Sequence, residues 1–195
     1  MKKFIVFVVV FCSVLVSSMT SAADRNYFNG DKNYIFCGGS MGMGFFVDRN
    51  TLNVEKYAPP IYIISVDVVN VRNYFNGGDK LGSRRRTYRF KYDYSTRKMY
   101  LYTPNGGENM RRRYENQYRG NQQKMDQARA VDWNSEWTYV FPDVFYGEGA
   151  VFPNVGEIAF ALAYKIKFHT KEHKRYQGDF YDGVRGVVDE LKDGI

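Results

Sequence analysis

The sequence predicts an α+β protein, built on an antiparallel sheet of about six strands with one packed helix and a short C-terminal helix. Aromatic residues form 17% of the chain, and Tyr and Phe favour the pleated, half-buried surface of a strand. The alternation of apolar and polar residues is strictest at residues 87–94. There one face carries Tyr88, Phe90, Tyr92 and Tyr94, and the other carries Arg89, Lys91 and Asp93. This period of two residues is typical of a strand with one buried face.

Three further segments are predicted as strands. Residues 98–103 follow a turn at Ser95-Thr96-Arg97 and complete a hairpin with residues 87–94. Residues 62–71 alternate until the phase slips at Val68-Val69, which indicates either a bulge or a strand covered on both faces. Residues 137–141 form the last strand, which Pro142 ends.

The segment before residue 62 contains a polar run, Arg49-Asn50-Thr51, between two apolar stretches at 45–48 and 52–56. This pattern predicts a short hairpin with its turn at residues 49–51. Pro59-Pro60 follows, and we expect an irregular joint there because proline restricts its own backbone and that of the preceding residue.

The segment 155–168 fits either a strand or a helix. Its apolar residues alternate, but Ile158, Leu162 and Ile166 also form a row at helical spacing, and Asn154 to Glu157 resembles a capping box. We favour a helix because the segment contains three alanines, and alanine is the best helix former. A second, short helix is predicted at 182–194 from the stripe Val184, Val187, Val188 and Leu191.

Residues 104–134 are rich in Asn, Gln, Arg and Glu. We interpret them as a polar insertion between strands, partly disordered, in which Met110, Tyr114 and Tyr118 allow a solvated helix with a thin apolar edge.

A short internal repeat is also present: the hexapeptide RNYFNG occurs at 25–30 and again at 72–77. The second copy predicts a hairpin tip because Asn-Gly favours tight turns.

The N-terminus predicts a secretory signal peptide. Lys2 and Lys3 precede an apolar run, and the small residues Ser21-Ala22-Ala23 follow it. We expect cleavage after Ala23, with Ala22 or an uncleaved anchor as the alternatives. The mature chain, residues 24–195, is then one β-rich domain of the periplasm, the cell surface or the medium, without a stable transmembrane span. Loss of the two lysines lowers the net charge from +7 to +5.

Cys37 is the one cysteine of the predicted mature chain, because Cys12 lies in the signal peptide. It follows the apolar residues Tyr34-Ile35-Phe36, so we expect a buried and inert thiol. An intermolecular disulfide and a reactive thiol are the alternatives.

Two arginine triplets are the candidate binding residues: Arg84, Arg85 and Arg86, and Arg111, Arg112 and Arg113. Arginine clusters near tyrosines suit polyanions, either nucleic acids or sulfated and phosphorylated glycans. Export argues against genomic DNA and favours an envelope or extracellular polyanion, or a surface protein. The alternative is a solvated surface that keeps the protein soluble.

Other motifs suggest no cofactor and no catalytic residue. The glycine-rich stretch 38–44 lacks the spacing of a phosphate loop and leads into Phe45-Phe46-Val47, so we interpret it as a strand connection. His169 and His173 match an inverted zinc motif, H-x-x-E-H, and are weak candidates for a metal site. We interpret them instead as a solvated helix end.

Several segments resemble small exported bacterial proteins with no assigned activity. These segments are residues 34–48 and 52–60, the hairpin start at 86–90, the tryptophan strand, and 153–164 with its Gly-Glu-x-Ala-Phe pattern. The order of hairpins and a closing helix more distantly resembles the surface adhesin E family. That resemblance implies an antiparallel sheet with a packed helix and a role in adhesion or cell-surface binding. The chain lacks the lipid-attachment motif of the lipidated adhesins, and no functional residue is carried over.

We therefore expect a non-catalytic binding or adhesion-like module of the cell envelope. The alternative is a secreted or periplasmic hydrolase whose acidic catalytic residues the sequence does not identify. A third hypothesis is a structural subunit that adds strands to a partner.

Overall fold

The computed structural model describes residues 26–142 and 151–169. The predicted signal peptide at 1–23, the predicted helix at 182–194 and His173 lie outside the described residues. In the described part of the chain, no helix is long and apolar enough to cross a membrane.

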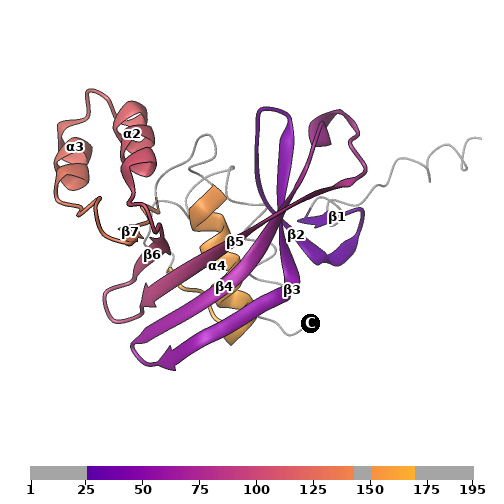
Figure 1. Ribbon diagram of the computed structural model, residues 1–195, viewed down its shortest axis with the longest axis horizontal. Helices are drawn as coiled ribbons and strands as arrows, with labels where there is room; N and C mark the ends of the chain where they lie inside the picture. The colour runs from indigo at the N-terminus through magenta and orange to yellow at the C-terminus, as the bar shows by residue number, and fades with distance from the viewer. Residues whose placement is uncertain (1–25, 143–150, 170–195) are drawn as a thin grey trace, which may run out of the picture.

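Seven antiparallel strands form one open sheet in chain order, so the α+β class is confirmed (Figure 1). The strands are β1 (Tyr27–Phe28), β2 (Asp31–Ser40), β3 (Met43–Ala58), β4 (Ile61–Val71), β5 (Leu81–Asp93), β6 (Lys98–Tyr102) and β7 (Trp137–Tyr139). The 3-10 turn η2 (Tyr74–Asn76) connects β4 to β5, and α2 (Glu108–Gln117) and α3 (Gln122–Arg129) lie between β6 and β7. Helix α4 (Val151–Tyr164) packs on one face of the sheet, against β2, β3, β4 and β6.

The hairpin predicted at residues 45–56 is wrong, because β3 runs through it as a single strand. The register with β4 shifts between Asp48 and Asn53, so the polar run forms a bulge. The Asp48 carboxylate accepts a hydrogen bond from the Asn50 N–H at 3.1 Å, and the Thr51 hydroxyl donates to the Asp48 carbonyl at 2.8 Å. Thr51 also accepts the N–H of Asp67 at 2.8 Å. At the bulge, hydrogen bonds from side chains thus take the place of the backbone hydrogen bonds between β3 and β4. The chain reverses direction only at Pro59-Pro60.

The phase slip in β4 predicted either a bulge or a strand covered on both faces, and the structure shows both. Val68 and Val69 are each buried, but Val68 faces the α4 core and Val69 faces a second apolar cluster on the opposite side of the sheet. The register with β5 also shifts between Val69 and Val71. Strand β4 therefore lies at the centre of two cores, which is why its sequence stops alternating.

A helix is confirmed in the segment predicted at 155–168, but it spans Val151–Tyr164, so it begins earlier and Ile166 of the predicted row lies beyond its end. Asn154 therefore lies inside the first turns and is not a capping residue; its side-chain amide donates to the Cys37 carbonyl at 2.8 Å. The predicted capping box is wrong for that reason. Cys37 itself is buried, and burial raises the pKa of its thiol well above the usual range, as expected for an inert core cysteine.

Gly156 allows α4 to lie close to the sheet. A Cβ at this position would overlap the sulfur of Met99 and touch the ring of Phe90, and the Gly156 carbonyl accepts a hydrogen bond from the Tyr92 hydroxyl at 2.8 Å. The buried faces of β5 and β6 thus meet helix backbone directly at this residue.

Gly156→Ala is expected to destabilise the protein, although alanine favours helices. The gain in helix propensity is about 1 kcal/mol, whereas overpacking of a dense core costs about 1–3 kcal/mol. Chemical denaturation of the single variant and of Gly156→Ala combined with Met99→Val tests this. The double variant should lose less than the sum of the two single losses, because Met99→Val removes the overlapping sulfur; simple additivity would contradict the prediction.

The two copies of RNYFNG take different local structures. In the first, Tyr27 and Phe28 form β1, and Asn29 and Gly30 have the positive φ angles of 51° and 76° of a tight hairpin turn. In the second, Asn73 at φ 53° and Gly77 at φ 84° flank η2, so this copy is the hairpin tip that the sequence predicts. Both copies supply a ring to the same cluster: Phe28 and Tyr74 each pack edge-on against Phe46, with centroids 5.4 and 5.1 Å away.

Candidate ligand-binding site

The face of β5, β6 and β7 that points away from α4 carries rows of aromatic and basic side chains. Lys91 pairs across the sheet with Tyr100, and Tyr100 pairs with Tyr139. In the next row, Tyr102 pairs with Trp137. The intervening residues, such as Phe90 and Leu101, are buried on the α4 side. Strict alternation on three neighbouring strands therefore gathers one class of side chain on the outer face.

Helices α2 and α3 form a wall beside this face. Tyr114 of α2 stacks on Phe141 just after β7, with ring centroids 3.8 Å apart. Trp133 stacks on the same ring, and its indole N–H donates to the carbonyl of Ala128 in α3 at 2.8 Å. Tyr114, part of the apolar edge predicted for this segment, thus packs the polar insertion against the residues that follow β7.

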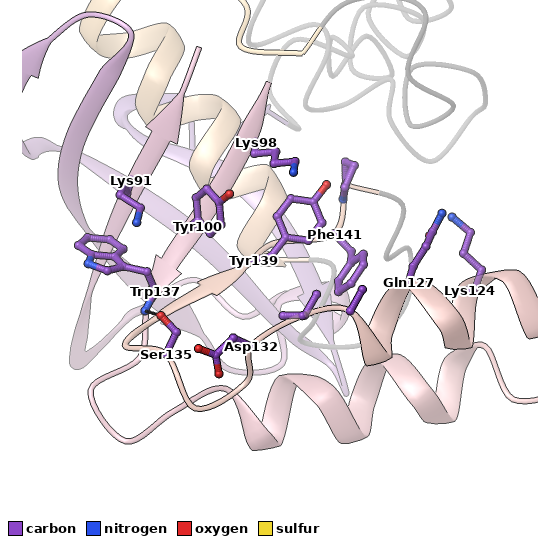
Figure 2. Close-up of a pocket in the computed structure, with 13 residues that line it drawn as sticks. Lys91, Lys98, Tyr100, Lys124, Gln127, Asp132, Ser135, Trp137, Tyr139 and Phe141 are labelled. Carbon is purple, nitrogen blue, oxygen red and sulfur yellow. Dashed lines mark hydrogen bonds between the residues drawn. The ribbon is translucent and has the colours of Figure 1, made fainter. Parts of the chain in front are cut away.

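A cleft of about 800 Å³ lies between the outer face and α3 (Figure 2). It is lined by Lys91, Lys98, Tyr100, Lys124, Gln127, Ala130, Val131, Asp132, Ser135, Trp137, Tyr139, Phe141 and Pro142. Lysines and aromatic rings dominate this lining, and Asp132 is the carboxylate among the residues that form it. The Asp132 carboxylate accepts the Asn134 N–H at 3.0 Å, which shapes the loop below the cleft. The cleft is therefore electropositive.

Lys91 lines the cleft beside two of these rings (Figure 2). Its ammonium nitrogen lies 4.8 Å from the centroid of the Tyr100 ring and 5.0 Å from that of Trp137. Partial burial lowers the pKa of Lys91. Within the ranges 26–142 and 151–169, Lys91 contacts these two rings and forms no ion pair. Ring quadrupoles attract a cation but do not neutralise it, so the ammonium keeps its capacity to bind an anion.

Arg89 is the next residue of β5 on the same face as Lys91, two positions earlier in the chain. Its guanidinium lies 5.3 Å from the ring centroids of both Tyr102 and Trp137 and also forms an ion pair with Glu55. The Trp137 ring thus borders both basic side chains. Of these two basic residues, Lys91 lines the cleft, whereas Arg89 does not and already has a carboxylate partner.

The first predicted arginine triplet is divided between the two faces of the sheet. Arg85 points to the outer face and pairs with the nearly buried carboxylate of Asp48, and this hydrogen bond raises the pKa of Arg85. Arg84 and Arg86 line a second cavity of about 660 Å³, which Tyr88 and Phe152 also border. Since neighbouring residues of a strand face opposite ways, three consecutive arginines in a strand do not form one patch.

The second predicted triplet lies on α2. Arg111 and Arg112 form ion pairs with Glu108 at 2.8 and 3.0 Å, and Arg113 borders a small pocket next to Tyr114. Hydrogen bonds from the two arginines lower the pKa of Glu108. The structure thus places the two triplets on separate elements, with part of each bound to a carboxylate of its own surroundings.

His169 is not part of a solvated helix end, so that interpretation is wrong. Helix α4 ends at Tyr164, Lys165 takes a positive φ of 57°, and the chain turns back toward the core. His169 is buried, and its Nδ1 contacts the buried carboxylate of Glu157. Of the residues placed in the structure, no group of three or more His, Cys, Asp or Glu side chains is arranged to hold a metal ion.

The residues of the cleft could have been found from the alternation of side chains along the strands, but not from runs of consecutive arginines. The alternation that identifies Arg89 and Lys91 as one face of a strand applies equally to Tyr100 and Tyr102 and to Trp137 and Tyr139. The order of the strands in the sheet, which brings these three pairs side by side, cannot be derived from the alternation alone. The glycine-rich stretch 38–44 forms the β2–β3 hairpin, as expected for a strand connection.

Comparison of the chain with protein-family models, with curated proteins and with solved structures finds no significant match in any of the three.

Proposed function

We propose that the protein is an exported, non-catalytic binding module of the bacterial cell envelope, and that its cleft binds an acidic oligosaccharide. The observation that carries this proposal is Lys91, which lines the cleft between two aromatic rings and has no carboxylate partner among the described residues. Such a cation is ready to bind an anion, because no ion pair has to be broken first.

The neighbours of Lys91 favour a sugar acid over a simple anion. Sugar rings present a flat apolar face of C–H groups and a rim of hydroxyls. Tyr100, Tyr139 and Trp137 offer aromatic surface from two neighbouring rows of the cleft. Gln127 and Ser135 also line it and offer hydrogen-bonding groups. Lys98 and Lys124 add positive charge for further carboxylate or sulfate groups along the ligand.

The open shape of the sheet supports a chain-like ligand. The cleft lies on the outer face of the last three strands, and the same face carries Tyr102 and Arg89 beside it. The resemblance to the surface adhesin E family agrees with recognition at a cell surface. The predicted signal peptide is consistent with a ligand outside the cytoplasm.

Lys91→Gln and Trp137→Ala are each expected to weaken the binding of acidic oligosaccharides about tenfold or more, because each removes a contact to the ligand. A tenfold loss corresponds to about 1.4 kcal/mol, which is within the range of one desolvated cation–π or charge contact. Isothermal titration with polygalacturonate and heparin oligosaccharides measures the effect. A neutral glucan of the same length should bind weakly, and the affinity for the acidic ligands should fall with salt.

Lys32→Gln is the matched control, since it removes the same charge from an exposed position on β2. Equal weakening by Lys32→Gln and Lys91→Gln would show a diffuse effect of net charge and contradict the proposed site. The hydrolase alternative makes a different prediction. Oligosaccharides would be shortened on incubation, and Asp132→Asn, which alters the carboxylate at the cleft, would abolish that cleavage while binding persists.

A further inference from the structure

Two hairpin tips lie together at one end of the sheet (Figure 1). One is the β2–β3 turn at Met41-Gly42, and the other is the β4–β5 connection that contains η2. The Tyr74 N–H donates to the Gly42 carbonyl at 2.9 Å. The ring of Phe75 lies over Gly39, where a Cβ would be within 2.5 Å of it. The two tips thus contact each other and form one projection.

This projection exposes two large apolar side chains. Met41 is 95% exposed and Phe75 is 61% exposed. Met41 also has a φ of 51°, in the left-handed region where turns normally have Asn, Asp or Gly. A methionine at this position disfavours the turn and buries almost nothing. Neither the stability of the fold nor the oligosaccharide cleft explains it.

Basic residues surround the base of the same projection. Arg72 and Lys80 flank η2, and Arg84 and Arg86 follow in β5; all four line the 660 Å³ cavity behind the tips. Asp79 is the carboxylate among the residues that line this cavity. The surface therefore combines apolar side chains at the tip with an excess of positive charge a few residues behind them.

We propose that this end of the molecule docks on an anionic lipid bilayer. Met41 and Phe75 enter the interfacial region of the bilayer, and Arg72 and Lys80, the basic residues next to the tips, lie toward the lipid phosphates. Apolar insertion and attraction to anionic headgroups are the two contributions that bind proteins to membrane surfaces. The positive charge behind the tips complements the charge of such a surface.

Sedimentation of the purified protein with lipid vesicles tests the proposal. Binding is expected to vesicles of phosphatidylcholine with phosphatidylglycerol, to be weak with phosphatidylcholine alone, and to fall as salt is added. Met41→Asn and Phe75→Ser together should lower the binding about tenfold or more, because both inserted side chains are lost. Met41→Asn should leave the unfolding midpoint unchanged or raised, since asparagine tolerates a positive φ.

Tyr57→Ser is the matched control for the apolar contribution. Tyr57 is 67% exposed, but it lies beside the β3–β4 turn, at the opposite end of β3 from the tips. Arg72→Gln with Lys80→Gln should reduce the salt dependence of binding, and Lys32→Gln should not. Equal binding of wild type and the tip variant, equal loss in Tyr57→Ser, or equal binding to neutral vesicles would each overturn the proposal. None of these outcomes depends on the oligosaccharide cleft.

Discussion

Glu157→Ala is expected to destabilise the protein by about 3–5 kcal/mol, the usual cost of removing one partner from a buried polar pair. Glu157 and His169 are both buried, and the Glu157 carboxylate contacts His169 Nδ1 and lies 3.5 Å from the His169 backbone nitrogen. Alanine would remove this acceptor and leave a cavity beneath α4. Urea denaturation followed by circular dichroism measures the loss.

Two further variants define the origin of that loss. Glu157→Gln keeps an oxygen that can accept a hydrogen bond from the imidazole, so it should lose clearly less stability than alanine. Glu136→Ala changes an exposed glutamate next to β7 and should stay within about 0.5 kcal/mol of wild type. If Glu157→Ala were as stable as Glu136→Ala, the pair would not be part of the core.

Phe46→Ala is expected to cost about 3–5 kcal/mol, the range for removal of a buried phenylalanine. Phe46 is fully buried at the centre of the second apolar cluster, on the side of the sheet opposite α4. Its ring makes edge-on contacts with Phe28, Phe36 and Tyr74, at centroid distances of 5.4, 5.5 and 5.1 Å. Thermal and chemical unfolding of the variant measure the effect.

The control for Phe46→Ala is Val54→Ala, which truncates a partly exposed residue of the same strand. It should change stability by less than about 1 kcal/mol, because much of its side chain already contacts solvent. A loss at Phe46 no larger than that at Val54 would mean that the outer cluster adds little to stability. Since Phe46 joins the two RNYFNG copies, this result would also leave the repeated hexapeptide without a structural role.

Alternation allowed the inner parts of the sheet to be predicted from the sequence. The predicted strands at 87–94 and 98–103 correspond to β5 and β6, because their period of two residues reflects one face buried against α4. The strand predicted at 62–71 corresponds to β4, whose alternation ends where both faces are buried. Helix was correctly favoured over strand for most of the segment 155–168, since its three alanines suit a helix that lies close to a sheet, but the helix ends at Tyr164. Cys37 was predicted to be buried from its apolar neighbours alone.

The errors occurred where a distant partner decides the local structure. Arg49-Asn50-Thr51 resembles a turn, but pairing along the whole of β4 makes it a bulge in a continuous strand. Asn154 resembles a cap, but its amide binds the Cys37 carbonyl instead. His169 resembles a solvated residue on a helix, but a reversal after Tyr164 buries it beside Glu157. In each case the interaction that decides the outcome joins residues far apart in the sequence.

The same division applies to the functional surfaces. The sequence by itself determined the fold class, the strand pattern, the basic charge and the two arginine triplets, because these depend on composition and local period. Only the tertiary structure divided Arg84, Arg85 and Arg86 between two faces and brought Lys91, Tyr100 and Trp137 together. It also joined Met41 and Phe75 at one end of the sheet. Strand order and register decide such groupings, and they arise from contacts between strands that no local pattern encodes.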